Sequence, residues 1–367
     1  MGLFNSGADS QHVCAVLKRR EKTLTVVTSR KVDDIIEEAY ALDPRLCGCI
    51  ENWSGSQSTT GALGIKKTYK LNLTYAPYTP DDVNDIIIDD GNWSFKQLTQ
   101  NGSELPDYIR VVTKSVKDFE KKIDAGLEEL RNTVFGLTGV TYTTSQPSGE
   151  YTSIAVIFKY CVDGARSKMW MQSAQRKVVE IDHNFFGNAP KLIKVFLAFS
   201  YIQQNCLYDQ ETADLIETQG STVDVSRPWV RLPYGPLCRG EGICEGIAAA
   251  YKLFMDYFGI DNQIVIGRAG EGSETGSHSW NMIKLGDQWF HVDPTAGIGG
   301  EGVYVGAFLK CDSEMEHLYL WDTSKYPRCI MKRPNYSSVE LYVDEHFDEL
   351  IESGVEEKYM QPDDISE

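Results

Sequence analysis

The sequence has no apolar run long enough to cross a membrane, although its hydrophobic content is ordinary at 42%. Its start, from Met1 to Asp9, has no apolar core of the length found in signal peptides. Gly2 and Ser6 fit the N-myristoylation pattern, but so short a pattern often matches by chance. We therefore expect a folded chain of 367 residues in two or three domains, without membrane insertion.

A disulfide framework is also lacking. The nine cysteines are an odd number without framework spacing, and a single residue separates Cys47 from Cys49, which is too close for a routine disulfide. Reduced thiols in a cytoplasmic protein are the simplest account of this pattern.

Basic residues are in deficit, since 36 Lys and Arg accompany 53 Asp and Glu, and the net charge is −17. This balance argues against nucleic acid and anionic membranes as partners. Residues 337–367 alone carry −10, so the acidity says little about a functional site. The segment 336–367 is predicted to begin as a docked helix and to end as a solvated acidic tail. Four apolar residues have the helical spacing: Val343, Phe347, Leu350 and Ile351.

Three short motifs follow one another, and each suits one member of a thiol-catalysis triad. Cys244 lies in Gly-Glu-Gly-Ile-Cys-Glu-Gly, His278 in Ser-His-Ser-Trp-Asn, and Asp293 in His-Val-Asp-Pro-Thr. A thiolate nucleophile needs a base that moves a proton, and the base needs a group that orients it. Each residue alone more often has a structural role, but together the three predict a catalytic site.

The cysteine motif is predicted to start a helix, because apolar residues recur at helical spacing from Cys244 to Phe258. The run Ala248 to Ala250 would let a sheet approach this helix closely. At a helix N-terminus the macrodipole and the free amides stabilise a thiolate, which is the nucleophilic form. Glu245 is a departure, because it places a like charge beside the thiolate.

The histidine and aspartate motifs are predicted to form a hairpin. Two strands, 277–285 and 288–295, flank a Gly-Asp pair that suits a tight turn. This closure sets three cross-strand pairs: Leu285 with Gln288, Trp280 with Asp293, and His278 with Thr295. Side-chain alternation then makes His278 and Asp293 same-face diagonal neighbours, about 7–8 Å apart at the backbone. An aspartate there can orient the imidazole toward a thiolate.

These motifs resemble the core of the transglutaminase-like cysteine hydrolases, a branch of the papain-like proteins. That family has a Cys-x-Gly-x-Ala helix, a His-x-Trp-Asn strand and a strand that ends in Asp-Pro-Thr, and all three occur here at family spacing. The resemblance implies an α+β fold in which a Cys-bearing helix packs on an antiparallel sheet, with residues 190–335 as the catalytic domain. It also implies a triad of Cys244, His278 and Asp293 that attacks an amide carbonyl and forms a thioester.

The triad does not choose the acceptor of the acyl group. Transfer to water would give a protease, isopeptidase or deamidase, and transfer to a lysine would give a protein-crosslinking transglutaminase. The resemblance favours hydrolysis of peptide, isopeptide or glutamine amide bonds in a protein or peptide substrate. A non-catalytic binding or scaffold protein that keeps the fold is a further alternative, although degenerate members would be expected to lose a triad residue. The oligomeric state is left open.

Weaker candidates surround the triad. Beside the Cys244 backbone amide, Tyr234 is a candidate second donor to an oxyanion, with a core tyrosine as the alternative. Trp280 is expected to line the cleft. His291 shares a face with the triad, but paired-ligand spacing is absent and no calcium loop is present, so we predict neither a metal nor a cofactor.

The N-terminal half is predicted to hold two related α+β modules, 1–100 and 101–189. Val-Val-Thr recurs at an offset of 85 residues, and Tyr75 and Tyr160 end alternating runs at the same offset. Coincidence is the alternative to duplication. The copies are predicted as strand, helix and strand: 23–28, 31–42 and 68–76 in the first, and 109–113, 115–130 and 152–161 in the second. Two segments, 50–67 and 144–152, are predicted to be polar loops.

Overall fold

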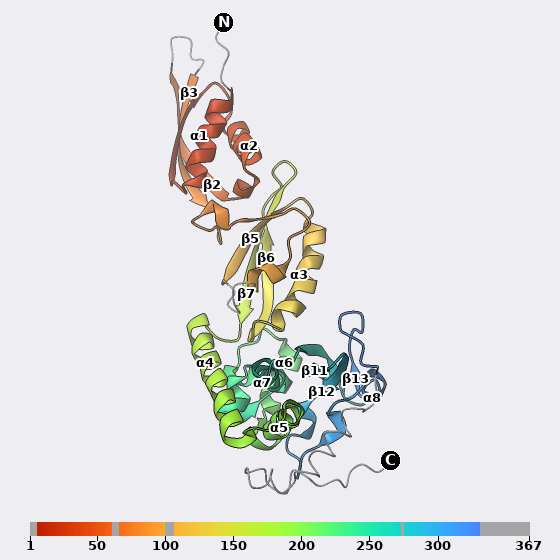
Figure 1. Ribbon diagram of the computed structural model, residues 1–367. Coiled ribbons are helices and arrows are strands. Elements are labelled where there is room, and N and C mark those ends of the chain that lie inside the picture. Colours follow the sequence, from red (N-terminus) through yellow and green to blue (C-terminus); the bar gives the residue numbers. More distant parts are fainter. Residues whose placement is uncertain (1–5, 61–65, 100–105, 273–274, 331–367) are drawn as a thin grey trace. The chain divides into compact units, whose positions relative to one another are not determined.

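The computed structural model describes residues 6–60, 66–99, 106–272 and 275–330 (Figure 1). Within them the chain forms two compact units. One combines the residues up to 133 with 139–159, and the other combines 134–138 with the residues from 160 onward. The predicted acidic helix and tail, 336–367, lie outside the described residues.

The first unit is built around two small sheets. The strand orders are β1-β3-β2 and β4-β5-β7-β6. Alternate residues of β1 are buried, and they pack with apolar residues of α1 and α2 into one core. The elements from the N-terminus to β7 are α1 (Ser6–Lys18), β1 (Thr23–Thr28), α2 (Val32–Leu42), β2 (Ile50–Thr60), β3 (Lys66–Tyr75), β4 (Ile87–Asp89), β5 (Tyr108–Thr113), α3 (Val116–Arg131), β6 (Leu137–Thr144) and β7 (Thr152–Tyr160).

Strand pairing in the two sheets keeps a constant offset. Thr23 of β1 pairs with Asn72 of β3, and Tyr108 of β5 pairs with Ile157 of β7. Each residue of the second pair lies 85 positions after its counterpart in the first pair. The remaining pairs of the two antiparallel ladders keep the same offset, and the order β1-β3-β2 corresponds to β5-β7-β6. We propose on this basis that the module with β1, β2 and β3 and the module with β5, β6 and β7 are duplicated copies.

The segment 50–67 was predicted to be a polar loop, and this prediction is wrong for residues 50–60, which form β2, and for residues 66 and 67, which begin β3. β2 pairs along its length with β3, for example Trp53 with Leu73. Its residues from 54 to 59 are all exposed. A strand with water on both faces shows no apolar alternation, so its sequence carries no strand period.

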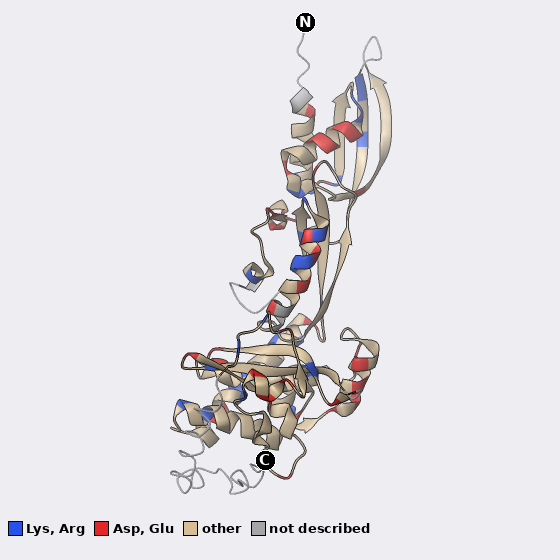
Figure 2. Cartoon of the chain, turned by 90° about the vertical axis from the view of Figure 1, so that its right-hand side faces the viewer, with Lys and Arg blue, Asp and Glu red and all other residues tan. Residues whose placement is uncertain are grey.

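Basic and acidic residues alternate in short stretches along α3 in the first unit (Figure 2). Lys121 pairs with Asp118 on the same helix, and Lys122 reaches Asp89 at the end of β4. The surface of α3 therefore carries both positive and negative charges rather than charges of one sign. Among the described residues, no helix is both long and apolar enough to span a membrane.

The second unit contains an antiparallel sheet of order β12-β11-β10-β13, against which helix α7 packs. This combination of helices and antiparallel strands confirms the predicted α+β class. The elements are α4 (Gly164–Ile181), α5 (Lys191–Asn205), β8 (Leu207–Tyr208), α6 (Gln210–Gln219), β9 (Glu241–Gly242), α7 (Cys244–Tyr257), β10 (Asn262–Ala269), β11 (Gly276–Leu285), β12 (Gln288–Val292), α8 (Asp312–Met315) and β13 (Tyr319–Leu320).

Helix α4 belongs to the second unit. Its residues Ala174, Val178 and Ile181 are buried in one core with apolar residues of α5 and α7. The unit therefore begins before residue 190, where the resemblance places the start of the catalytic domain. An amphipathic stripe shows that a helix covers a core, but it does not show which core.

Candidate active site

Cys244 is the first residue of α7, as the sequence pattern predicts. Ile243 holds the N-cap position with an extended backbone and contributes no side-chain cap, and its N–H donates to the Val230 carbonyl at 3.1 Å. Cys244 is a half-buried residue. A half-buried cysteine at the positive end of a helix has the setting of a nucleophile.

Gly246 has a packing reason in the Cys-x-Gly pattern. A Cβ atom at this position would lie 2.2 Å from the Val230 carbonyl oxygen. The 3₁₀ turn Pro228–Arg231 therefore passes directly over the first turn of α7. A side chain at Gly246 would push this segment away from the cysteine.

The charge of Glu245 is compensated. The Glu245 carboxylate accepts from Arg231 Nε at 2.9 Å, and the Arg231 side chain is only 3% exposed. The like charge that the sequence places beside Cys244 is thus one half of an ion pair.

The hairpin turn has the predicted register, with Leu285 opposite Gln288. The ladder ends at Val292, because the Asp293 N–H donates to the Ala307 carbonyl at 2.9 Å and a 3₁₀ turn, Pro294–Gly297, follows. The two predicted pairs beyond Val292 are therefore wrong: Trp280 with Asp293, and His278 with Thr295.

His278 and Asp293 nevertheless meet. His278 Nε2 lies 2.7 Å from Asp293 Oδ2, and the Asp293 side chain is 1% exposed. Tyr319 Oη donates to the same carboxylate oxygen at 2.8 Å, and the Thr295 N–H donates to the other at 2.9 Å. His278 also hydrogen-bonds Cys244. Because Nε2 bonds the carboxylate, we infer that Nδ1 is the ring nitrogen that serves the sulfur.

The electrostatics of this pair favour the imidazolium. Burial alone would lower the pKa of His278, but the Asp293 carboxylate and the Cys244 sulfur outweigh it and raise that pKa to about 10. Burial would raise the pKa of Asp293, but His278, Tyr319 and the Thr295 N–H lower it. At neutral pH the histidine is therefore positively charged, as a thiolate partner requires.

We expect the His278–Asp293 pair to stabilise the fold at neutral pH and to lose this effect at alkaline pH. His278 binds its proton more tightly in the folded state, with a pKa of about 10, than in the unfolded state, with a pKa of about 6.5. Its stabilisation is complete below about pH 6.5 and is lost as the pH rises through about 10. Urea unfolding of the wild type and of His278→Gln should show a difference in the free energy of unfolding that shrinks over this range. A difference that stays constant would contradict the assignment.

Asn281 joins the histidine strand to the cysteine helix. Its Nδ2 donates to the Ala248 carbonyl of α7 at 2.9 Å, and the residue is completely buried. This contact gives the asparagine of the His-x-Trp-Asn motif a structural role. It ties β11, which carries His278, to α7, which carries Cys244.

Tyr208 is a residue that the sequence motifs missed. β8 pairs in parallel with β9, which leads directly into α7. The Tyr208 hydroxyl thereby contacts the Cys244 side chain and the Cys244 backbone N–H, and burial and the Cys244 sulfur raise the pKa of Tyr208. No local pattern marks this tyrosine, because it reaches the site only through strand pairing.

An ion-pair cluster secures the pairing of β8 with β9. The Arg227 guanidinium donates to Asp209 at 2.8 Å and to Glu241 at 2.7 Å. Asp209 follows Tyr208 directly, and Glu241 lies in β9. Arg227 thus holds together the two short strands that bring Tyr208 to Cys244.

The two weaker candidates have other placements. Tyr234 stacks on Trp170, with ring centroids 5.2 Å apart and planes at 7°, and packs against the main core. The hydroxyl that contacts Cys244 is that of Tyr208. Trp280 was expected to line the cleft, but it is completely buried, and its Nε1 donates to His291 Nδ1 at 2.9 Å. Trp280 therefore packs against the site from the protein interior and does not line a cleft.

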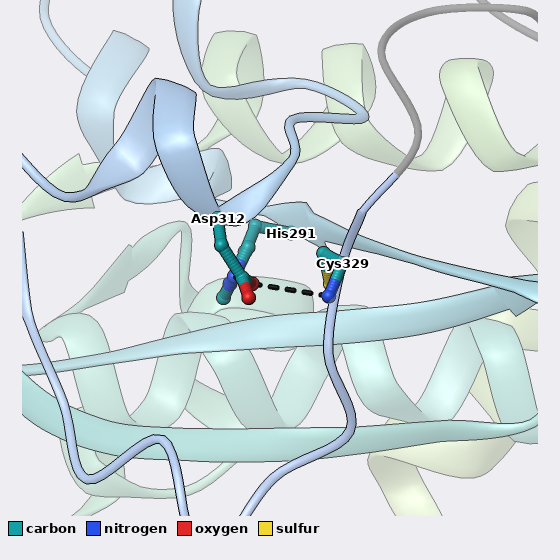
Figure 3. A group of neighbouring side chains, drawn as sticks. All are labelled: His291, Asp312 and Cys329. Carbon is teal, nitrogen blue, oxygen red and sulfur yellow. Dashed lines mark hydrogen bonds and ion pairs between the residues drawn. The ribbon is translucent and has the colours of Figure 1, made fainter.

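One buried cluster has the residue types of a metal site. His291, Asp312 and Cys329 place their ligand atoms within 4.8 Å of one another (Figure 3). A metal-binding imidazole needs a free nitrogen lone pair. Here Nδ1 accepts from Trp280, and Nε2 lies 3.1 Å from Asp312 Oδ1. Asp312 also accepts from Arg328 Nε and the Cys329 N–H, so the cluster fits a hydrogen-bond network better than a metal.

Comparison with known proteins gives the family of this region. Residues 188–294 match the model of the transglutaminase-like superfamily. This segment belongs to that superfamily. The match covers Cys244, His278 and Asp293 and confirms the resemblance that the sequence motifs indicate. No curated protein matches the sequence at a significant level.

Three solved structures with related descriptions are similar at low identity. A "Putative Cysteine Protease" from Cytophaga hutchinsonii has 11% identity and a TM-score of 0.27, and the match covers 43% of this chain and 63% of that one. A TGase has 14% identity and a TM-score of 0.25, with 76% and 79% covered. The periplasmic domain of TgpA from Pseudomonas aeruginosa, bound to ethylmercury, has 13% identity and a TM-score of 0.25, with 80% and 95% covered.

Proposed function

We propose that the protein is a transglutaminase-like cysteine hydrolase whose triad is Cys244, His278 and Asp293. The observation that carries this proposal is the chain of contacts from the Cys244 sulfur through the His278 ring to the buried Asp293 carboxylate. Its substrates would be peptide, isopeptide or glutamine amide bonds of a protein or peptide. The need for a reduced thiolate agrees with the cytoplasmic location that the cysteine pattern predicts.

In the first half of the reaction, the Cys244 thiolate attacks the carbonyl carbon and forms a C–S bond. The C–N bond then breaks, and the proton on His278 Nδ1 passes to the departing amine. A thioester on Cys244 is left. In the second half, His278 takes a proton from water, the resulting hydroxide attacks the thioester, and the acid leaves as the Cys244 thiolate is restored. Asp293 keeps the ring in place through Nε2.

The oxyanion of each step needs donors beside the nucleophile. The Cys244 N–H at the start of α7 is one, and the Tyr208 hydroxyl that contacts it is the natural second. Tyr208 is a half-buried residue, and its hydroxyl contacts Cys244, so we assign to it a donor role toward a substrate oxygen at the sulfur. We assign to Tyr208 the role that the sequence motifs suggested for Tyr234.

Tyr208→Phe should lower turnover by about 10²–10³-fold, because one oxyanion donor is lost while the ring keeps its packing. Alkylation of Cys244 by iodoacetamide forms no oxyanion, so its rate should change far less. The two rates are measured on the same preparation. Equal loss in both would show that Tyr208 acts on the thiol and not on the oxyanion.

The acceptor of the acyl group is tested with a glutamine-containing peptide and a biotin-labelled primary amine, in reductant and EDTA. Hydrolysis predicts that ammonia and free acid appear faster than amine incorporation, and that EDTA has no effect. Faster incorporation of the amine, or activity that returns only on adding calcium, would indicate a transglutaminase. If neither product forms from a broad peptide mixture and Cys244 shows no special reactivity, the protein is a binding member of the superfamily.

A further inference from the structure

We propose that His291 and Asp312 are positioning residues, which hold the Trp280 indole against the His278 imidazole and so keep the base aligned with Cys244. This inference rests on the proposed function and extends it to two residues outside the triad. It also gives a purpose to the buried cluster of Figure 3, which fits a metal poorly.

Trp280 forms the wall behind the base. Its ring stacks on that of His278, with centroids 6.0 Å apart and planes at 18°. Tyr319 meets Trp280 edge-on at 5.1 Å and donates its hydroxyl proton to Asp293. One face of the His278 imidazole is therefore packed against the Trp280 indole. The Asp293 carboxylate, which orients the imidazole, is held by the Tyr319 hydroxyl.

His291 holds the Trp280 indole through one hydrogen bond, in which the indole is the donor. Trp280 Nε1 donates to His291 Nδ1 at 2.9 Å, and both side chains are completely buried. Because Nδ1 accepts, the proton of a neutral ring must sit on Nε2, and Nε2 faces Asp312 Oδ1 at 3.1 Å. Asp312 thus selects the one tautomer of His291 that can accept from the indole.

Asp312 is itself fixed from several sides. It accepts from Arg328 Nε at 2.5 Å and from the Cys329 N–H at 3.1 Å. The His291 backbone exchanges two hydrogen bonds with Lys310, at 2.8 and 3.0 Å, shortly before Asp312. The network therefore runs from the segment 310–329 through His291 and Trp280 to the base.

The alternative is that His291 only fills the core, and a pair of substitutions of similar size separates the two roles. Asparagine places a side-chain oxygen near the position of Nδ1, so His291→Asn keeps an acceptor for Trp280. His291→Leu keeps the volume but leaves the buried indole N–H without an acceptor. A positioning role predicts different results for the two variants, whereas a packing role predicts similar ones.

The readout is the rate at which iodoacetamide alkylates Cys244, followed by mass spectrometry from about pH 5 to about pH 9, because this rate reports the thiolate–imidazolium pair without any substrate. His291→Leu should slow alkylation near pH 6 by about 10-fold and move the pH of half-maximal rate upward, since the ring loses its alignment. His278 is faced by Cys244 of α7, Asp293 after β12 and Tyr319 of β13, and neither substitution changes any of these residues. His291→Asn should recover most of the rate.

A double-mutant cycle completes the test. In a Trp280→Phe background there is no N–H to anchor, so adding His291→Leu should change the Cys244 rate by less than about 2-fold. This double variant removes donor and acceptor together, so it serves even if His291→Leu alone does not fold. The inference is overturned if leucine and asparagine have equal effects, or if His291→Leu slows the reaction as much in the Trp280→Phe background. Failure of the proposed function looks different, because wild-type Cys244 would then react no faster than the exposed Cys238.

Discussion

Cys244→Ala should lower turnover by about 10⁶-fold, to the limit of detection, while the protein stays folded. The loss is large because the step that forms the thioester has no other nucleophile. The fold should survive because Cys244 is a half-buried residue at the start of α7, where loss of one sulfur atom leaves little buried space. Turnover of a cleaved peptide and the midpoint of urea unfolding measure the two effects.

Cys238→Ala is the matched control, since Cys238 is an exposed cysteine of the same unit. It should keep wild-type turnover and stability. If Cys244→Ala retained activity on a substrate that the wild type cleaves, the triad assignment would be wrong.

Asp293→Asn should lower turnover by about 10⁴-fold with a small change in KM, because it favours the wrong tautomer of His278. The carboxylate accepts from Nε2–H and so leaves Nδ1 to take the Cys244 proton, which forms the thiolate–imidazolium pair. An amide N–H at this position would donate to Nε2 instead, so the neutral ring would carry its only proton on Nδ1 and could not take the proton of the thiol. The split between kcat and KM separates this effect from a loss of substrate binding.

Tyr319→Phe is the comparison for this variant. It removes one hydrogen bond to the Asp293 carboxylate but keeps the charge and the ring. Its loss of turnover should be far smaller, about 10-fold. Turnover of Asp293→Asn within about 3-fold of the wild type would contradict an orienting role for this residue.

The turn, the strand register near it and the start of the helix could be predicted from the sequence, because interactions between residues close in the chain determine them. The turn at Gly286 has φ 62°, a left-handed conformation that glycine adopts without strain, and this turn fixes the register from Leu285 to Asn281. Helical spacing from Cys244 onward sets the start of α7. Two motifs with correct local geometry were enough to bring His278 and Asp293 close together.

The parts that could not be predicted depend on contacts between distant segments. Tyr208 reaches Cys244 only because β8 pairs with β9, and Tyr319 reaches Asp293 only because β13 adds to β10. Arg231 neutralises Glu245 across a turn that local pattern does not reveal. Trp280 was wrongly predicted to line a cleft, because it lies two residues after His278 in the motif. The sequence does not reveal that its indole N–H has a buried partner in His291.

The most direct test of the central claim is a map of alkylation rates for the nine cysteines, measured by mass spectrometry at about pH 6 in wild type and in His278→Ala. Cys244 should react fastest, ahead of the more exposed Cys238, because His278 favours its thiolate. His278→Ala should remove that advantage and leave the other cysteines unchanged. A Cys244 that reacts no faster than Cys238, or that reacts equally fast without His278, would contradict a thiolate–imidazolium pair at this site.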